Sequence, residues 1–169
     1  MNYQKRKGYK FFITTLPEDI VKLITLYCDP DTDYYRDKIK KICNDNNISS
    51  YGYNYKYKYR TDDMVDKTSI CNILRCMNEA PYIFKPLKTV YKTGSYGGKH
   101  SIEIYRRLFN DKGNNYISNG EFIVAMILLG YKYKKYDNSP NFVFRCSSLL
   151  TDYNNCHNKT FLIKYNLHS

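Results

Sequence analysis

The sequence predicts an α+β protein built around one buried helix. Ser118 and Glu121 have the Ser-x-x-Glu spacing of a capping box, which marks a helix start. Every residue from Phe122 to Leu129 is apolar, so this helix has no face for water. After Gly130, two alternating segments flank a turn-rich connection at 137–140, which is typical of a β-hairpin. We therefore expect an N-terminal helical pair, then a compact unit with amphipathic helices around one buried helix and a C-terminal β-hairpin.

Two helices are expected before residue 50. The first spans about residues 16–28, because Thr15 and Glu18 have capping-box spacing and Pro17 is tolerated in a first turn. The second is capped by Asp31 or Thr32 and runs to about Cys43, with an apolar side largely opposite its basic residues. Residues 1–50 would form this helical segment and residues 51–169 the compact unit, unless the whole chain is a single domain.

Between residues 51 and 60, tyrosines alternate with glycine, asparagine and basic residues. A period of two predicts a strand with the tyrosines on one face and the cations on the other. One interpretation is a platform that stacks unpaired bases and follows phosphates. The other is an ordinary half-buried strand with solvated lysines. Both leave a basic stripe formed by Lys56, Lys58 and Arg60.

Further elements follow in the middle of the chain. An amphipathic helix is expected at 66–79, ended by Pro81. Residues 82–91 form at best a short or edge strand, because Pro86 cannot donate to a sheet. Near the C-terminus, residues 160–165 are a last candidate strand.

A glycine-rich segment, Gly94-Ser-Tyr-Gly-Gly-Lys-His100, precedes the next expected helix at 99–110. It is one residue short of a phosphate-binding loop and has His100 in place of a hydroxyl. We interpret it as a turn with positive φ, and an anion site formed by Lys99 and the helix N-terminus stays open. Apolar residues of the helix available to the core are Ile102, Tyr105, Leu108 and Phe109.

Charge is the main functional signal in the composition. Lysine and arginine total 27 against 16 acidic residues, giving a formal net charge of +11. Such a charge favours anionic partners such as nucleic acid or a membrane surface, or it serves solubility alone. The longest apolar run, Phe122 to Leu129, is far shorter than the roughly 20 residues that span a bilayer. We expect no membrane insertion, no signal peptide and an intracellular protein.

Neither metal chemistry nor catalysis is expected. The spacing of Cys71, Cys76, Cys146 and the pair Cys156-His157 is not that of a zinc site, and the thiols are expected to be reduced. His100 and Glu103, three residues apart on a helix, are most simply a surface contact. With no diagnostic nucleophile and base, we expect a non-enzymatic protein without a cofactor or metal.

The order helix, helix, hairpin from Lys99 to Cys146 resembles the second half of a winged-helix domain. In that arrangement the second helix enters the major groove and the hairpin forms the wing. The segment Phe122 to Leu129 carries no side chain that reads base edges, so only non-specific binding of DNA or RNA is expected. The candidate nucleic-acid-binding residues are Lys56, Lys58, Arg60, Lys99, Arg106, Arg107, Lys132, Lys134 and Lys135.

Residues 14–30, TTLPEDIVKLITLYCDP, resemble the opening helix of an F-box motif, with Leu-Pro, an acidic pair and apolar residues at helical spacing. The resemblance implies an F-box-like adaptor for host protein interaction, which recruits a ubiquitin ligase by binding a host adaptor protein. Its partner-binding residues would be Leu16, Pro17, Ile20 and Ile24.

The segments SYGGKHSIE and 116–144 are similar to small uncharacterised proteins of phages and large DNA viruses. A composition with 20 tyrosines, no tryptophan and abundant Asn, Lys and Ile resembles that of mimivirus-like giant viruses. These resemblances imply a viral protein in the host cytoplasm or the virion. Weak, charge-driven nucleic-acid binding is the leading hypothesis, and a host adaptor or a structural virion component are the alternatives.

Overall fold

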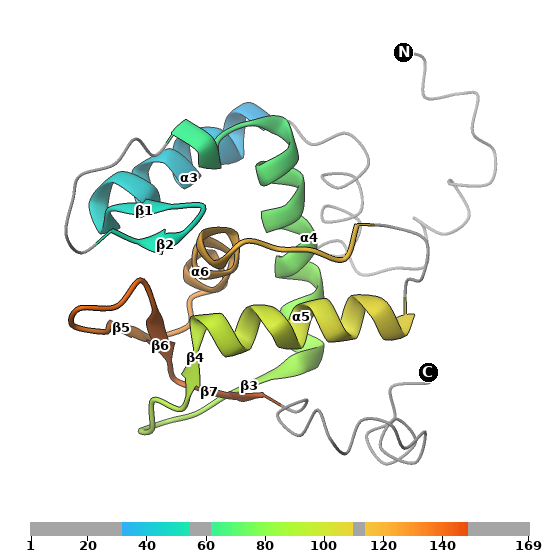
Figure 1. Ribbon diagram of the computed structural model, residues 1–169, viewed down its shortest axis with the longest axis vertical. Coiled ribbons are helices and arrows are strands. Elements are labelled where there is room, and N and C mark those ends of the chain that lie inside the picture. Colours follow the sequence, from blue (N-terminus) through green and yellow to red (C-terminus); the bar gives the residue numbers. More distant parts are fainter. Residues whose placement is uncertain (1–31, 55–61, 110–113, 149–169) are drawn as a thin grey trace.

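The computed structural model of the chain describes residues 32–54, 62–109 and 114–148 (Figure 1). The predicted helix at 16–28 and the predicted strand at 160–165 lie outside the described residues. So do seven of the candidate site residues, which are Leu16, Pro17, Ile20, Ile24, Lys56, Lys58 and Arg60.

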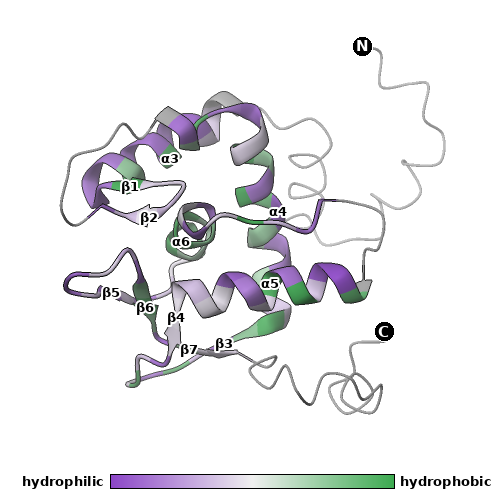
Figure 2. Cartoon of the chain, in the orientation of Figure 1, coloured by the Kyte–Doolittle hydropathy of each residue, from purple (hydrophilic) through white to green (hydrophobic). Residues whose placement is uncertain are grey.

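The described residues confirm an α+β fold with one central helix. The α-helices are α3 (Thr32–Asn46), α4 (Lys67–Ile83), α5 (Ser95–Phe109) and α6 (Asn119–Leu128), with a short 3-10 helix, η2 (Asp62–Met64). Figure 1 shows α6 nearly end-on, with α3, α4 and α5 around it, and each of the three contacts it. The apolar character of α6 contrasts with the polar outer turns of α3 and α5 (Figure 2).

The central helix α6 matches the sequence prediction in its burial and its start. All residues from Asn119 to Met126 are buried. The Ser118 hydroxyl accepts a hydrogen bond from the Glu121 N–H at 3.1 Å, and the Ser118 N–H donates to the Glu121 carboxylate at 2.8 Å. This reciprocal pair is the expected capping box.

The end of α6 is a Schellman motif centred on Gly130, whose φ is +77°. The N–H of Tyr131 donates to the carbonyl of Met126 at 3.0 Å, and the N–H of Gly130 donates to that of Ile127 at 2.9 Å. The glycine therefore ends the helix, as predicted.

Helix α4 begins as expected and ends later than expected. The Asp66 carboxylate accepts hydrogen bonds from the N–H groups of Thr68 and Ser69, which caps the first turn. The prediction that Pro81 ends the helix was wrong, since α4 continues to Ile83. The Phe84 N–H donates to the carbonyl of Ala80, and both Ile83 and Phe84 are buried, so tertiary packing holds the last turn.

The glycine-rich segment is helical, which corrects the turn prediction. Helix α5 starts at Ser95, and Gly97 and Gly98 lie in its first two turns without a positive φ. A Cβ on Gly98 would lie 2.4 Å from the Phe122 ring, so this glycine allows α5 to approach α6 closely. Leu108, expected in the core, is 43% exposed.

Three small antiparallel sheets complete the part of the fold that the structure describes. One is the hairpin of β1 (Ile48–Ser49) and β2 (Gly52–Tyr53), and another pairs β3 (Phe84–Pro86) with β7 (Cys146–Ser148). The third has the order β4-β6-β5, with β4 (Thr93–Gly94), β5 (Tyr133–Lys135) and β6 (Phe142–Phe144). The pairing of β5 with β6 confirms the predicted hairpin, and β4 adds a third strand beside it.

The β1–β2 hairpin covers the N-terminal end of α6. The Gly120 N–H donates to the Ser50 carbonyl at 3.1 Å, and the Asn119 amide donates to the carbonyls of Tyr51 and Pro140 at 3.2 and 3.1 Å. The hairpin spans residue 50, and α3 on its N-terminal side contacts both α4 and α6.

Candidate nucleic-acid interface

The chain from Phe142 to Ser148 separates an inner face of the sheets from an outer one. Residues at even positions of this segment are buried and those at odd positions are half-exposed. Successive side chains of a strand point to opposite faces, and directly opposed side chains of paired strands share a face. The outer face is therefore marked by Val143, Arg145 and Ser147.

Strand pairing adds three lysines to this outer face. Lys134 lies opposite Val143 in the β5–β6 pair, and Lys85 lies opposite Ser147 in the β3–β7 pair. Lys132 is the residue just before β5. The Arg145 N–H donates to the Lys132 carbonyl at 2.8 Å, which places these two residues side by side. Cations from β3, β5 and the β6–β7 junction thus converge on one surface.

Tyr91 packs against two of these cations. The Lys134 Nζ is 4.7 Å and the Arg145 Cζ 4.8 Å from the centroid of its ring, which is cation–π distance. The Arg145 guanidinium also donates to the Lys88 carbonyl at 2.9 Å. The loop between β3 and β4 therefore runs beside Arg145 and contributes two more exposed lysines, Lys88 and Lys92.

We call this surface the basic face and define it by six cations, two of which lie at cation–π distance from the Tyr91 ring. Its carboxylate content is low, since residues 84–94 and 131–148 contain only one acidic residue, Asp137. Among the described residues, no carboxylate lies within 4.0 Å of any of the six charged groups. Their charge is therefore available to an anion. The six cations are Lys85, Lys88, Lys92, Lys132, Lys134 and Arg145.

The hairpin lysines divide between two sides. Lys132 and Lys134 are exposed on the basic face, where they could contact a ligand, as the hairpin prediction requires. Lys135 lies opposite Phe142 on the inner side, with its Nζ 5.0 Å from the ring of Tyr53. Lys135 is exposed at the end of β5, but its cation is directed toward β2 instead of the basic face.

Two of the predicted nucleic-acid contacts are wrong, because the structure buries them. Arg106 is 1% exposed, with its Nε 2.8 Å from a carboxylate oxygen of Glu79 and its NH1 donating to the Tyr116 carbonyl at 3.0 Å. Lys99 is 7% exposed, and its Nζ is 3.0 Å from the Glu103 carboxylate. Neither cation can reach an external phosphate. The alternative anion site at Lys99 is also ruled out, because Glu103 neutralises the charge of Lys99.

Arg107 is exposed but stands apart from the basic face. Its Nε donates to the Glu103 carbonyl one turn earlier at 3.3 Å. It lies near the end of α5 that is remote from β4 (Figure 1). The structure therefore brings together Lys132 and Lys134 of the predicted set.

Glu103 is the centre of a separate polar cluster on α5. Its carboxylate accepts hydrogen bonds from Lys99 and contacts the His100 Nδ1 at 2.7 Å, so the predicted contact between His100 and Glu103 is present. Partial burial raises the pKa of Glu103, but the hydrogen bonds from Lys99 and His100 outweigh burial and hold it below the ordinary value. Lys99 also reaches the Ile117 carbonyl at 3.5 Å, so the cluster fastens the segment before α6.

Replacement of Glu103 by glutamine should remove a pH-dependent part of the stability. Because the folded-state pKa lies below 4.5, the stabilising charge is present above that pH and is lost as the pH falls through the folded pKa. The difference in free energy of unfolding between wild type and Glu103→Gln should be largest near neutral pH and shrink below 4.5. Urea unfolding across this range measures it, and a difference that does not change with pH would contradict the assignment.

No family model, curated protein or solved structure matches the chain. Four of the six cations of the basic face, and Tyr91, were not among the predicted site residues, although a signal for them exists in the sequence. From Ala80 to Ile102 the chain has no acidic residue, so the lysines of this stretch have no local partner. The residues missed are Lys85, Lys88, Tyr91, Lys92 and Arg145.

The described residues hold no cluster of three or more potential metal ligands among His, Cys, Asp and Glu. Burial raises the pKa of Cys43 to about 12 and also raises that of Cys76, so both thiols stay protonated at neutral pH. None of the described helices has the length and apolarity to cross a bilayer. The adaptor prediction, which rests on residues 14–30, stays a prediction.

Proposed function

We propose that this protein binds nucleic acid without sequence specificity through the basic face. The observation that carries the proposal is the set of six cations of the basic face, none of which has a carboxylate partner among the described residues. The face extends from Lys85 on β3 to Lys134 on β5, so it offers charge along a line instead of at one point. A polyanion with regularly spaced charges suits such a surface.

The chemistry of the face supports contacts to phosphate. Five of the six cations are lysines, whose flexible ammonium groups act as point charges and impose little geometry on the anion. Neutralising phosphates releases counterions, and this term supplies essentially all of non-specific binding. Typical dissociation constants of such binding are about 10⁻⁴ to 10⁻⁶ M at physiological salt.

The position of α6 supports non-specific binding. A winged-helix reader would insert this helix into the major groove. Here the residues from Asn119 to Met126 are buried, and the β1–β2 hairpin covers the N-terminal end of α6. Helix α6 therefore cannot contact base edges, and the β5–β6 hairpin remains as the binding element of this unit.

The double variant Lys132→Ala/Lys134→Ala tests the proposal. Because binding of a single strand weakens with salt in proportion to the phosphates neutralised, the slope of log affinity against log salt should fall by about 0.7 for each lysine removed. Fluorescence anisotropy with a labelled oligonucleotide, at about 50 to 200 mM salt, measures the slope.

Lys40→Ala/Lys41→Ala is the matched control, because it removes the same charge from exposed positions on α3. In Figure 1, α3 lies on the side of α6 away from β4 and β7. The control should keep the wild-type slope. Equal slopes for both double variants, or no binding of any strand at low salt, would refute the proposal.

A further inference from the structure

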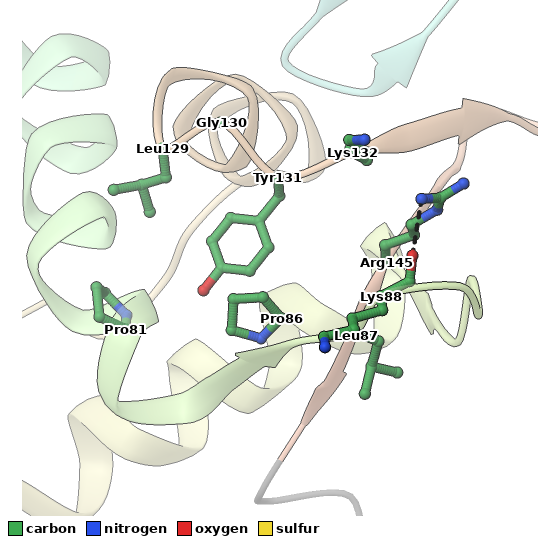
Figure 3. Close-up of a pocket in the computed structure, with 9 residues that line it drawn as sticks. All are labelled: Pro81, Pro86, Leu87, Lys88, Leu129, Gly130, Tyr131, Lys132 and Arg145. Atoms are coloured by element: carbon green, nitrogen blue, oxygen red, sulfur yellow. Dashed lines mark hydrogen bonds between the residues drawn. The ribbon is translucent and has the colours of Figure 1, made fainter.

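A pocket of about 510 Å³ opens beside the basic face (Figure 3). It lies where the ends of α4 and α6 meet β3 and the approach to β5. This volume is within the range of about 300 to 1,000 Å³ that is usual for sites that bind small organic groups. The pocket shares Lys88, Lys132 and Arg145 with the basic face.

One end of the pocket is apolar and contains a flat ring. Figure 3 shows the ring of Tyr131 between Leu129 and Pro86, with Pro81 beyond. The Tyr131 hydroxyl donates to the Phe84 carbonyl at 2.9 Å, which fixes the orientation of the ring. Burial raises the pKa of Tyr131 to about 12, so the phenol stays neutral and does not repel an anion.

The other end of the pocket is cationic. Lys132 and Arg145 lie across from Pro81 and Leu129, and Lys88 lies beside Arg145 (Figure 3). The Arg145 Nε is shielded from solvent and has no hydrogen-bond partner among the described residues. No acidic residue lines the pocket. Three cationic side chains without a carboxylate partner among the described residues are suited to an anionic oxygen.

We propose that this pocket receives one unpaired base of a single-stranded nucleic acid, while Arg145, Lys88 and Lys132 hold the adjoining phosphate. The inference rests on the proposed function and adds a preference for single strands. An unpaired base can stack on aromatic or apolar side chains, whereas a base in a duplex is already paired and stacked. The apolar end of the pocket suits the base of a nucleotide, and the cationic end suits its phosphate.

The direction in which the nucleotide lies follows from the two helices. Both α4 and α6 end at the apolar side of the pocket, at Ile83 and Leu128. Carbonyl groups give helix C-termini a partial negative charge, which disfavours a phosphate there and tolerates the N–H groups of a base edge. The phosphate therefore belongs at Arg145 and the base at Tyr131.

The first test compares two single strands of about 12 nucleotides, one intact and one with abasic sites in its central part. Both carry the same phosphates. We expect the intact strand to bind at least about fivefold more tightly, because stacking contributes about 1 to 3 kcal/mol per base. A duplex of the same sequence should bind like the abasic strand, and RNA versions of both strands show whether the sugar matters.

Two variants locate this difference in the pocket. Tyr131→Leu removes the ring and should abolish most of the preference for the intact strand. Tyr131→Phe keeps the ring and loses only the hydroxyl, so it should retain the preference. Affinity for the abasic strand should not change in either variant. Thermal unfolding of both confirms that the comparison is made between folded proteins.

A cross-linking measurement on the wild-type protein does not depend on any substitution. A single strand that carries 5-iodouracil forms photochemical bonds to aromatic rings in contact with the base. The cross-linked peptide should contain Tyr131, and a cross-link only at another tyrosine would overturn the inference.

The outcomes for the two proposals differ. Failure of all strands to bind refutes the proposed function, and the inference with it. Equal, salt-dependent binding of intact and abasic strands refutes only the inference and leaves the function of the basic face in place.

Discussion

Replacing Glu79 with alanine is expected to lower the free energy of unfolding by about 3 to 5 kcal/mol, the usual result of breaking a buried ion pair from one side. The Arg106 side chain is 0% exposed and Glu79 is its only carboxylate partner among the described residues. Glu79 also accepts from the Arg75 Nε at 2.9 Å, so its loss leaves two guanidinium groups without their counter-charge. Urea unfolding followed by circular dichroism measures the change.

Two further variants make this result specific to the buried pair. Asp37→Ala removes a carboxylate from an exposed position of α3 and should alter stability by less than about 0.5 kcal/mol. The double variant Glu79→Leu/Arg106→Met removes both charges and should recover much of the loss, because apolar pairs often replace buried ion pairs without cost. A loss below about 1 kcal/mol for Glu79→Ala would show that burial of the Arg106 charge does not depend on Glu79.

Gly120→Ala should be nearly as damaging, with an expected loss of about 3 kcal/mol or more, at the upper end of overpacking effects. A Cβ at this position would lie 1.9 Å from the Ser49 carbonyl oxygen. The obstacle is backbone, so the β1–β2 hairpin must move away from α6 and the bond from the Gly120 N–H to the Ser50 carbonyl must lengthen or break. The midpoint of thermal unfolding and the free energy from urea both report the effect.

The matched control is Gly97→Ala on α5. A Cβ at Gly97 meets no atom within 4 Å, and alanine is a better helix former than glycine by up to about 1 kcal/mol. The two glycine substitutions should therefore change stability in opposite directions. If Gly120→Ala were as stable as the wild type, the hairpin would not be packed against α6 as closely as described.

The parts of the fold that the sequence predicted correctly depend on residues close together in the chain. Ser118 and Glu121 satisfy each other's backbone groups within four positions, and Gly130 ends α6 through bonds to the preceding turn. The β5–β6 hairpin is likewise set by a short connection between two alternating segments. Such local signals carry their own structural consequence.

The corrections concern residues whose partners are distant in the sequence. Arg106 looks like a surface cation until Glu79, 27 positions earlier, is placed beside it. Pro81 looks like a helix end until the burial of Ile83 and Phe84 outweighs its missing donor. Gly98 looks like a turn residue until the Phe122 ring of α6 occupies the space above it. Tertiary contacts decide all of these cases, and local propensity does not contain them.

The candidate site shows the same division. Lys132 and Lys134 could be found from the hairpin pattern alone. Tyr91, Lys88 and Lys92 belong to the loop between β3 and β4, which has no periodic pattern, and its place beside Arg145 depends on the pairing of β3 with β7. Only the assembled sheets show that the two groups of cations share one face.

The junction at Arg145 gives the basic face a second consequence. Arg145 lies between β6, which pairs with β4 and β5, and β7, which pairs with β3. A bound nucleic acid that contacts Lys132 on one side and Lys85 on the other would hold two separate sheets together. Because a ligand that binds only the folded state adds its binding free energy to stability, occupancy would oppose separation of these sheets as well as unfolding of each. The surface that binds the ligand would then also be the place where the ligand stabilises the contact between the two sheets.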